Sequence, residues 1–175
     1  MAGGGVSSAY DPLDVTEFLV EEIEAAVLAA ADWGTYVCAH VYTPTGIQRC
    51  LKAAVKSIEH GQLADEDTVK MMADTGAVWS IQPLVEALAS SGLTPEMVSK
   101  ARVMWDGTDT AYQLAIKHGV PTGWGSDILF DAKATEEQGK NLPYMSRWYT
   151  PAQAFKQATA NNAFILGMSG PRNPY

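Results

Sequence analysis

Short apolar runs alternate along the chain with longer segments in which apolar residues recur at helical spacing. The apolar runs predict strands at residues 35–40, 55–60, 77–81 and 120–124. The helical periodicity predicts helices at residues 20–33, 43–53, 65–75, 95–118 and 152–159. Because each strand is followed by a helix, the pattern predicts parallel βα units.

Residues that start and stop helices sharpen these boundaries. Thr43 and Thr150 each precede a proline, which is favoured at the first helical position. Gly76 is the expected stop of the helix before it. A short helical stretch near 84–90 and a long polar connection at 128–143, expected to be either a functional loop or a mobile one, complete the pattern.

The number of units suggests half of a familiar architecture. A barrel of eight βα units takes about 250 residues. This chain has 175 residues and about four units. We therefore expect an α/β fold, a partial TIM (β/α)8 barrel that corresponds to the second half and fills residues 1–175 as one domain. An isolated half would leave two strand edges and one apolar sheet face uncovered.

Composition narrows the classes of partner. Hydrophobic residues make up 47% and charged residues 18% of the chain, as in globular proteins. The net charge of -8 disfavours nucleic acid and anionic membranes, which both bind basic surfaces. The sequence shows neither a secretory signal nor an apolar stretch of the roughly 18 residues that span a bilayer. We therefore expect no nucleic-acid and no membrane partner.

The two cysteines do not form a disulfide framework. Cys38 falls in an apolar strand and Cys50 in a helix, so both are expected to be small buried hydrophobic residues. This usage fits a reducing compartment, the cytoplasm. The alternative is a ligand or nucleophile role for Cys38, two residues before His40.

Polar side chains with metal-binding chemistry fall where predicted strands end. His40 ends the first strand, His60 ends the second just before Gly61, and Asp127 follows the fourth. Because the carboxyl ends of parallel strands share one face, these side chains are expected to meet. Two imidazoles and a carboxylate suit a divalent metal of the zinc type. The alternative is that each histidine is a hydrogen-bonded structural residue.

Other polar and aromatic residues carry weaker signals. Tyr42 is predicted to bind a substrate oxygen, with packing as the alternative. Glu59 should face away from its histidine neighbour and pack, and His118 suits a helix end. Lys140 and Arg147 are expected on the surface, with a substrate carboxylate as the alternative. Core or interface positions are expected for Trp79, Trp105, Trp124 and Trp148.

Four segments together resemble the amidohydrolase superfamily, in its imidazolonepropionase and Xaa-Pro dipeptidase branch. They are YVCAHVYTP, AAVKSIEHGQLADEDTVKMMADTGA, HGVPTGWGSD and YTPAQAFKQATANNAFILGMSGPRNPY. The resemblance covers essentially the whole chain, including the spacing between segments. It implies a metal-dependent hydrolase on a distorted (β/α)8 barrel. His40 and His60 resemble the metal ligands of the fifth and sixth barrel strands, and Asp127 resembles the eighth-strand aspartate that handles the proton of the attacking water.

The chain also departs from this family pattern. The first-strand His-x-His pair and the fourth-strand lysine that bridges two metals are absent. In the family that lysine lies just ahead of a glycine-rich segment like AGGGVSSAYDPLD, so Met1 resembles an internal methionine. The tail resembles one cut before the β-sandwich strands. Binuclear chemistry is therefore not expected.

The resemblance implies metal-dependent hydrolysis of a C–N amide bond in a small molecule such as a dipeptide or N-acyl amino acid. Asp127 would be the catalytic residue, one divalent metal, preferably Zn, would be the cofactor, and the protein would be a homo-oligomer. One alternative is a non-catalytic half-barrel that oligomerises or pairs with a missing N-terminal half. Another is a single-metal esterase or lactonase.

Overall fold

A computed structural model describes residues 1–8, 10–89, 92–128 and 131–172. The described strands form one parallel sheet in chain order. They are β1 (Cys38–Val41), β2 (Ser57–His60), β3 (Val78–Ile81) and β4 (Thr122–Trp124). A parallel sheet whose order follows the sequence is one arc of a βα barrel, as the sequence predicted.

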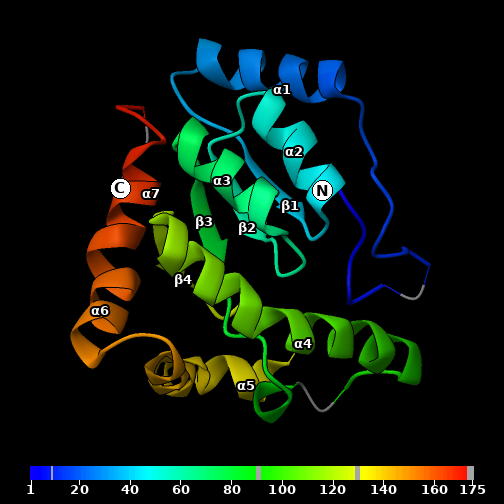
Figure 1. Cartoon of the computed structure of the whole chain (residues 1–175), viewed down its shortest axis with the longest axis vertical. Coiled ribbons are helices and arrows are strands. Elements are labelled where there is room, and N and C mark those ends of the chain that lie inside the picture. The colour runs from blue at the N-terminus through cyan, green and yellow to red at the C-terminus, as the bar shows by residue number, and fades with distance from the viewer. Residues whose placement is uncertain (9, 90–91, 129–130, 173–175) are drawn as a thin grey trace.

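The helix before β1 and the helices between the strands lie together on one face of this sheet. They are α1 (Val20–Asp32), α2 (Pro44–Lys52), α3 (Glu66–Thr75) and α4 (Pro95–His118). In Figure 1, α3 lies between α2 and α4, and α1 packs across α2 at the top. The C-terminal helices α6 (Pro151–Lys156) and α7 (Asn162–Gly167) lie beside β4. None of the described helices combines the length and hydropathy needed to cross a membrane.

The core lies between the sheet and this helical layer. Its fully buried members include Val41, Ile47, Ile58, Val69, Met72, Trp79, Ile81 and Tyr112. Strand and helix boundaries agree with the predicted ones to within a few residues. The helix at 95–118 is a single unbroken element.

The segment at 128–143 differs from its prediction. It was expected to be a functional or mobile loop, but most of it is helical: α5 (Ala132–Glu136) precedes a 3-10 run, η2 (Gln138–Arg147). The side chain of Asp131 accepts from the backbone N–H of Ala134 at 2.9 Å and so caps α5. Met145 is the one buried residue of η2, so the segment lacks the repeated apolar positions that signal a helix.

Both edges of the sheet are partly covered, in contrast to the expectation for an isolated half-barrel. The backbone N–H of Ala2 donates to the carbonyl of His40 on β1 at 2.8 Å. At the other edge, the Asn162 side chain accepts from the N–H of Trp124 at 3.1 Å and donates to its carbonyl at 2.7 Å. These contacts satisfy backbone groups that would otherwise be open to strand pairing.

The uncovered sheet face is mixed rather than apolar. A shallow hollow on it is lined by Tyr36, Cys38, Glu59, Ser80, Trp124 and residues of α7. Cys38 is exposed there, so the prediction that it is buried is wrong, whereas Cys50 is buried as predicted. The cause is that the first strand is covered by helices on one face only, and Cys38 lies on the other.

Candidate active site

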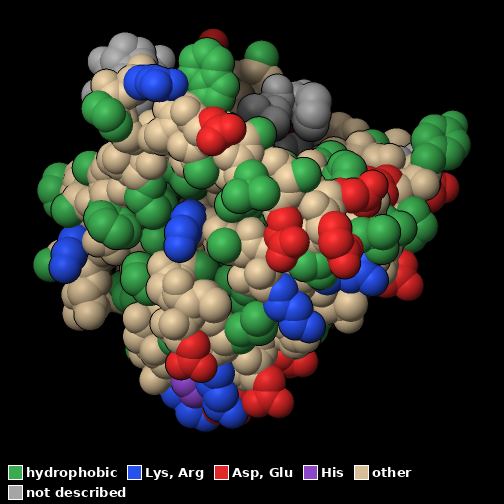
Figure 2. All heavy atoms as spheres, turned by 90° about the horizontal axis from the view of Figure 1, so that it is seen from above, with side chains coloured by type: hydrophobic (Ala, Val, Ile, Leu, Met, Phe, Trp, Pro, Cys, Tyr) green, Lys and Arg blue, Asp and Glu red, His purple; other side chains and the backbone are tan. Residues whose placement is uncertain are grey.

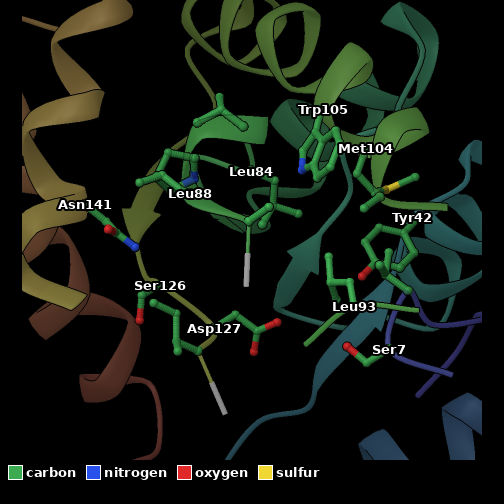
Figure 3. Close-up of a pocket in the computed structure, with 16 residues that line it drawn as sticks. Ser7, Tyr42, Leu84, Leu88, Leu93, Met104, Trp105, Ser126, Asp127 and Asn141 are labelled. Atoms are coloured by element: carbon green, nitrogen blue, oxygen red, sulfur yellow. The ribbon is translucent and has the colours of Figure 1, made fainter. Parts of the chain in front are cut away.

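A cavity of about 120 Å³, partly open to solvent, lies at the carboxyl ends of the strands. Figure 3 shows Tyr42 and Asp127 in its wall, with Ser126 beside Asp127. Tyr42 follows β1, and Ser126 and Asp127 follow β4. Residues from the two outer strands of the sheet thus meet at one mouth, where βα folds hold their chemistry.

The backbone at His60 turns sharply as β2 ends. His60 and Gly61 both have left-handed conformations, with φ of 71° and 72°. The buried indole of Trp79 donates to the carbonyl of His60 at 2.6 Å. A Cβ at Gly61 would lie 2.5 Å from that indole nitrogen, so glycine is required at this turn.

The side chain of His60 is held in one orientation. Its Nδ1 lies 2.8 Å from Oε1 of Gln82, an oxygen that only accepts, so Nδ1 carries the proton. Its Nε2 lies 3.9 Å from Oδ2 of Asp127. Burial, and then the neighbouring His40, lower the pKa of His60 to about 4. His60 is therefore a neutral imidazole whose Nε2 lone pair faces Asp127.

His40 and Tyr42 complete an aromatic cluster around His60. The ring centroids of His40 and His60 lie 4.4 Å apart, and Tyr42 lies 5.0 Å from each. Nε2 of His40 contacts the carbonyl of Gly4 at 2.9 Å, so this nitrogen donates. Burial, followed by the charge of Asp127, raises the pKa of Tyr42, which keeps its hydroxyl protonated.

Asp127 stands at the exit of β4. Its backbone is left-handed, with φ of 51°, and about half of its side chain is exposed. Partial burial raises the pKa of its carboxyl group, and the neighbouring His40 works in the opposite direction. A carboxylate with weakened hydration next to a neutral imidazole is suited to accept a proton.

The donor types fit a single divalent cation, although their positions do not yet enclose one. Donors on one zinc at about 2.0–2.1 Å lie roughly 3.3 Å apart, and the gap between His60 and Asp127 is 3.9 Å. His40 directs Nε2 at the carbonyl of Gly4 instead. Across the part of the chain that the structure describes, no group of three His, Cys, Asp or Glu side chains is arranged to hold a metal. The metal-ligand role of these residues stays a prediction.

The glycine-rich N-terminal segment crosses the mouth of the site. The ammonium of Lys100, on α4, donates to the carbonyls of Gly5, Ser8 and Asp11. A Cβ at Gly4 would lie 1.7 Å from the carbonyl oxygen of Pro12, so only glycine fits that close approach. This segment brings Val6 and Ser7 into the cavity wall.

Sequence reasoning did not identify Gln82, Trp79 and Lys100 as parts of the site. A signal existed for Gln82, because it is a polar residue at the exit of the third predicted strand, as His60 is at the second. Trp79 was expected only in the core, and its indole N–H contact depends on the register of β2 and β3. Lys100 carries no local signal, because its acceptors lie about 90 residues earlier.

Four of the weaker candidates, Glu59, His118, Lys140 and Arg147, lie outside the cavity lining. Glu59 accepts from the hydroxyl of Ser57 at 2.5 Å on the uncovered sheet face. His118 contacts Glu66 at 3.1 Å near the end of α4, as a helix-end role predicts. Lys140 pairs with Glu137, and Arg147 pairs with Asp109, so neither cation is directed at the cavity.

Comparison of the sequence with known proteins identifies relatives of this chain. A sequence model of the amidohydrolase family matches residues 1–171. Ochratoxinase from Aspergillus niger is 33% identical over 175 residues, which cover 98% of this chain and 36% of that protein. The chain thus spans just over a third of the length of the curated relative it matches.

Solved structures of similar proteins superpose on nearly the whole of this chain. An amidohydrolase structure superposes with a TM-score of 0.88 at 35% identity, over 95% of this chain and 41% of that one. A prolidase solved with N-methylphosphonate-L-proline superposes with a TM-score of 0.87 at 33% identity, over 97% of this chain and 42% of that one. The partial barrel is therefore confirmed.

Proposed function

Because the chain belongs to the amidohydrolase family, we propose that its site hydrolyses the C–N bond of a small amide, such as a dipeptide or an N-acyl amino acid. The observation that carries this proposal is the cluster in which a neutral His60 lies against His40, Tyr42 and Asp127. Tyr42 and Asp127 of this cluster line the cavity. Relatives described as an ochratoxinase and a prolidase support an amide or peptide bond as the target.

A divalent metal, in the first instance zinc, would be held by His40, His60 and Asp127. When bound, such an ion polarises the scissile carbonyl and lowers the pKa of water toward neutrality. His60 suits this role because it is uncharged and because Gln82 fixes its tautomer, as partners behind a metal-binding histidine commonly do.

Side chains of the site carry out the proton transfer and bind the substrate carbonyl. Asp127 accepts a proton from the attacking water and transfers it to the leaving nitrogen, so that one water and one amide give one acid and one amine. Tyr42 donates its hydroxyl proton in a hydrogen bond to the substrate carbonyl oxygen, which its raised pKa permits.

A second candidate is a non-catalytic half-barrel. The arrangement of the donors favours it, since within the described ranges no three of them are grouped to hold a metal. In that case the chain would act through association with a second copy or with a first half-barrel.

Metal binding and hydrolysis in matched histidine variants test the proposal. We expect the full chain to bind one zinc in equilibrium dialysis and to hydrolyse N-acyl amino acids. His60→Ala should weaken zinc binding by about 100-fold, because it removes a ligand, and should abolish hydrolysis. His118→Ala removes a histidine that contacts Glu66 outside the cavity lining and should change neither. A metal-free wild type, or equal loss in both variants, would contradict the hydrolase and support the half-barrel.

The proposal also covers the substrate, the assembly and the cellular compartment of the protein. A small molecule is the expected substrate, and a homo-oligomer is the expected assembly. Cys38 and Cys50 are free thiols, which is consistent with the reducing cytoplasm suggested by the sequence.

A further inference from the structure

The cavity at the site has two chemically different walls. The polar wall contains Tyr42, Ser126 and Asp127 from the ends of β1 and β4. Figure 3 shows Leu84, Leu88 and Trp105 across the cavity from Asp127. This second wall is apolar and includes Leu84, Val85, Leu88, Ala89, Met104 and Trp105.

The apolar wall comes from a single stretch of chain. The 3-10 turn η1 (Glu86–Leu88) carries Leu88, and the middle of α4 carries Met104 and Trp105. Met104 is fully buried, so the helix that bears this wall is anchored in the core. Glu86, the acidic residue of η1, is exposed and is not part of the lining. The described part of the wall is thus apolar and without charge, and its α4 portion is anchored in the core.

None of the described residues that line this cavity has a cationic side chain. Asp127 is the one charged side chain among the described lining residues. Lys100, a cation on the same helix as Trp105, is already bound by three backbone carbonyls of the N-terminal segment. A carboxylate placed against the apolar wall would therefore find no cationic side chain in the described lining, which disfavours an acidic group at this position of the substrate.

We propose that the apolar wall formed by Leu84, Val85, Leu88, Ala89, Met104 and Trp105 is a subsite that selects amides carrying a bulky, uncharged, preferably aromatic group next to the scissile bond. This inference rests on the proposed function for the place of that bond, between Tyr42 and Asp127. A ring against the indole of Trp105 gains stacking in addition to burial, which favours aromatic over aliphatic groups.

Binding to the metal-free full chain tests the subsite without requiring turnover. The probes are N-acetyl-L-phenylalaninamide, which is neutral and aromatic, and N-acetyl-L-aspartate, which is anionic, measured by calorimetry. We expect the neutral probe to bind at least about tenfold more tightly. Trp105→Ala should weaken it by about tenfold, because the aromatic wall is lost. Trp33→Ala removes an exposed tryptophan at the end of α1 and should leave binding unchanged.

A charge-reversal variant gives a second measurement. Leu88→Arg should raise affinity for the aspartate probe and lower it for the neutral one. If this variant does not fold by circular dichroism, Trp105→Ala decides. Equal affinity for both probes, or no effect of Trp105→Ala, would overturn the proposal and identify the space as a packing gap. Selective binding without hydrolysis would support the subsite and contradict the proposed hydrolase activity. Hydrolysis without any preference between the probes would support the hydrolase activity and contradict the subsite.

Discussion

His60 combines a left-handed backbone with nearly complete burial, a costly pair of features for a histidine. Its φ is 71° and its exposed fraction is 6%. Strain of this kind costs about 1–3 kcal/mol and persists where the surroundings enforce it. Here the indole of Trp79 holds the carbonyl and Gln82 holds Nδ1. Trp79 lies in β3 and Gln82 follows it directly, so the neighbouring strand and its exit fix the residue on which the proposed chemistry depends.

Stability should fall in mild acid because of His60. Its pKa in the folded protein is about 4, against 6.5 in the unfolded chain. Between these values the unfolded chain binds a proton that the folded protein does not, so stability present above about pH 6.5 is lost as the pH falls to about 4. We expect a loss on the order of 3 kcal/mol in urea unfolding of the metal-free protein.

Two comparisons isolate this effect. His60→Asn keeps a residue that tolerates the left-handed backbone and should flatten the pH dependence, whereas His118→Asn should leave it in place. Asp127 acts in the opposite direction at the acid end, because its raised pKa lets the folded protein take up a proton just above pH 3.8. An equally steep curve in His60→Asn would contradict the assignment.

At this scale the sequence predicted where side chains lie but not what holds them. The strand exits of His60 and Asp127 could be inferred because parallel strands share one functional face. The contact between His60 and Gln82 could not, since it depends on strand register and on a rotamer. The contact of His40 with Gly4 likewise joins residues 36 apart, with no local pattern to indicate it.

At the scale of elements, the C-terminal helical run is interrupted at a place that serves the sheet. Residues 157–161 form a π turn between α6 and α7. The turn precedes Asn162 and includes Asn161, and both side chains bond to the backbone of β4. A π turn shifts the side chains that follow it around the helix axis, which here directs two amides at the edge strand.

Removing these amides should have graded effects. Asn162→Ala deletes two hydrogen bonds to Trp124, and we expect it to lower the free energy of unfolding by about 1–3 kcal/mol. Asn161→Ala deletes one bond to Thr122 and should cost about 1 kcal/mol. Urea unfolding measures both. Equal losses, or none, would show that the sheet edge does not depend on the pairing.

Elements with strong local signals were predictable, and those without were not. The helix α3 has Asp65 as its N-cap and Gly76 as its left-handed stop, and its limits were foreseen. The π turn was not, because Gln157 to Asn161 carry no residue that demands it. Exposure of Cys38 was missed because an apolar strand was assumed to be covered on both faces.

At the scale of the whole molecule, one face of the sheet is left without a covering layer of helices in the described part of the chain and is a candidate surface for a second copy of the chain. Leu166 borders the hollow on that face and is 56% exposed. Figure 2, viewed from the side on which α1 lies, shows hydrophobic side chains dispersed among charged ones. The distribution favours the sheet face and α7, rather than the α1 side, as the place where a second copy binds.

Sedimentation velocity over a concentration series tests this assembly. We expect the wild type to form a dimer. The hollow places apolar side chains next to the half-buried Glu59, and a monomer would leave this surface exposed to solvent. Leu166→Glu places a charge beside that carboxylate and should shift the equilibrium to monomer. Leu28→Glu makes the same change at a 67% exposed position on α1 and should leave the dimer intact. A monomeric wild type, or dissociation of both variants, would mean that the uncovered face of the sheet is not covered by a second copy. The half-barrel would then be stable with this mixed face in water. The hydrogen bonds at both edges of the sheet make such stability feasible.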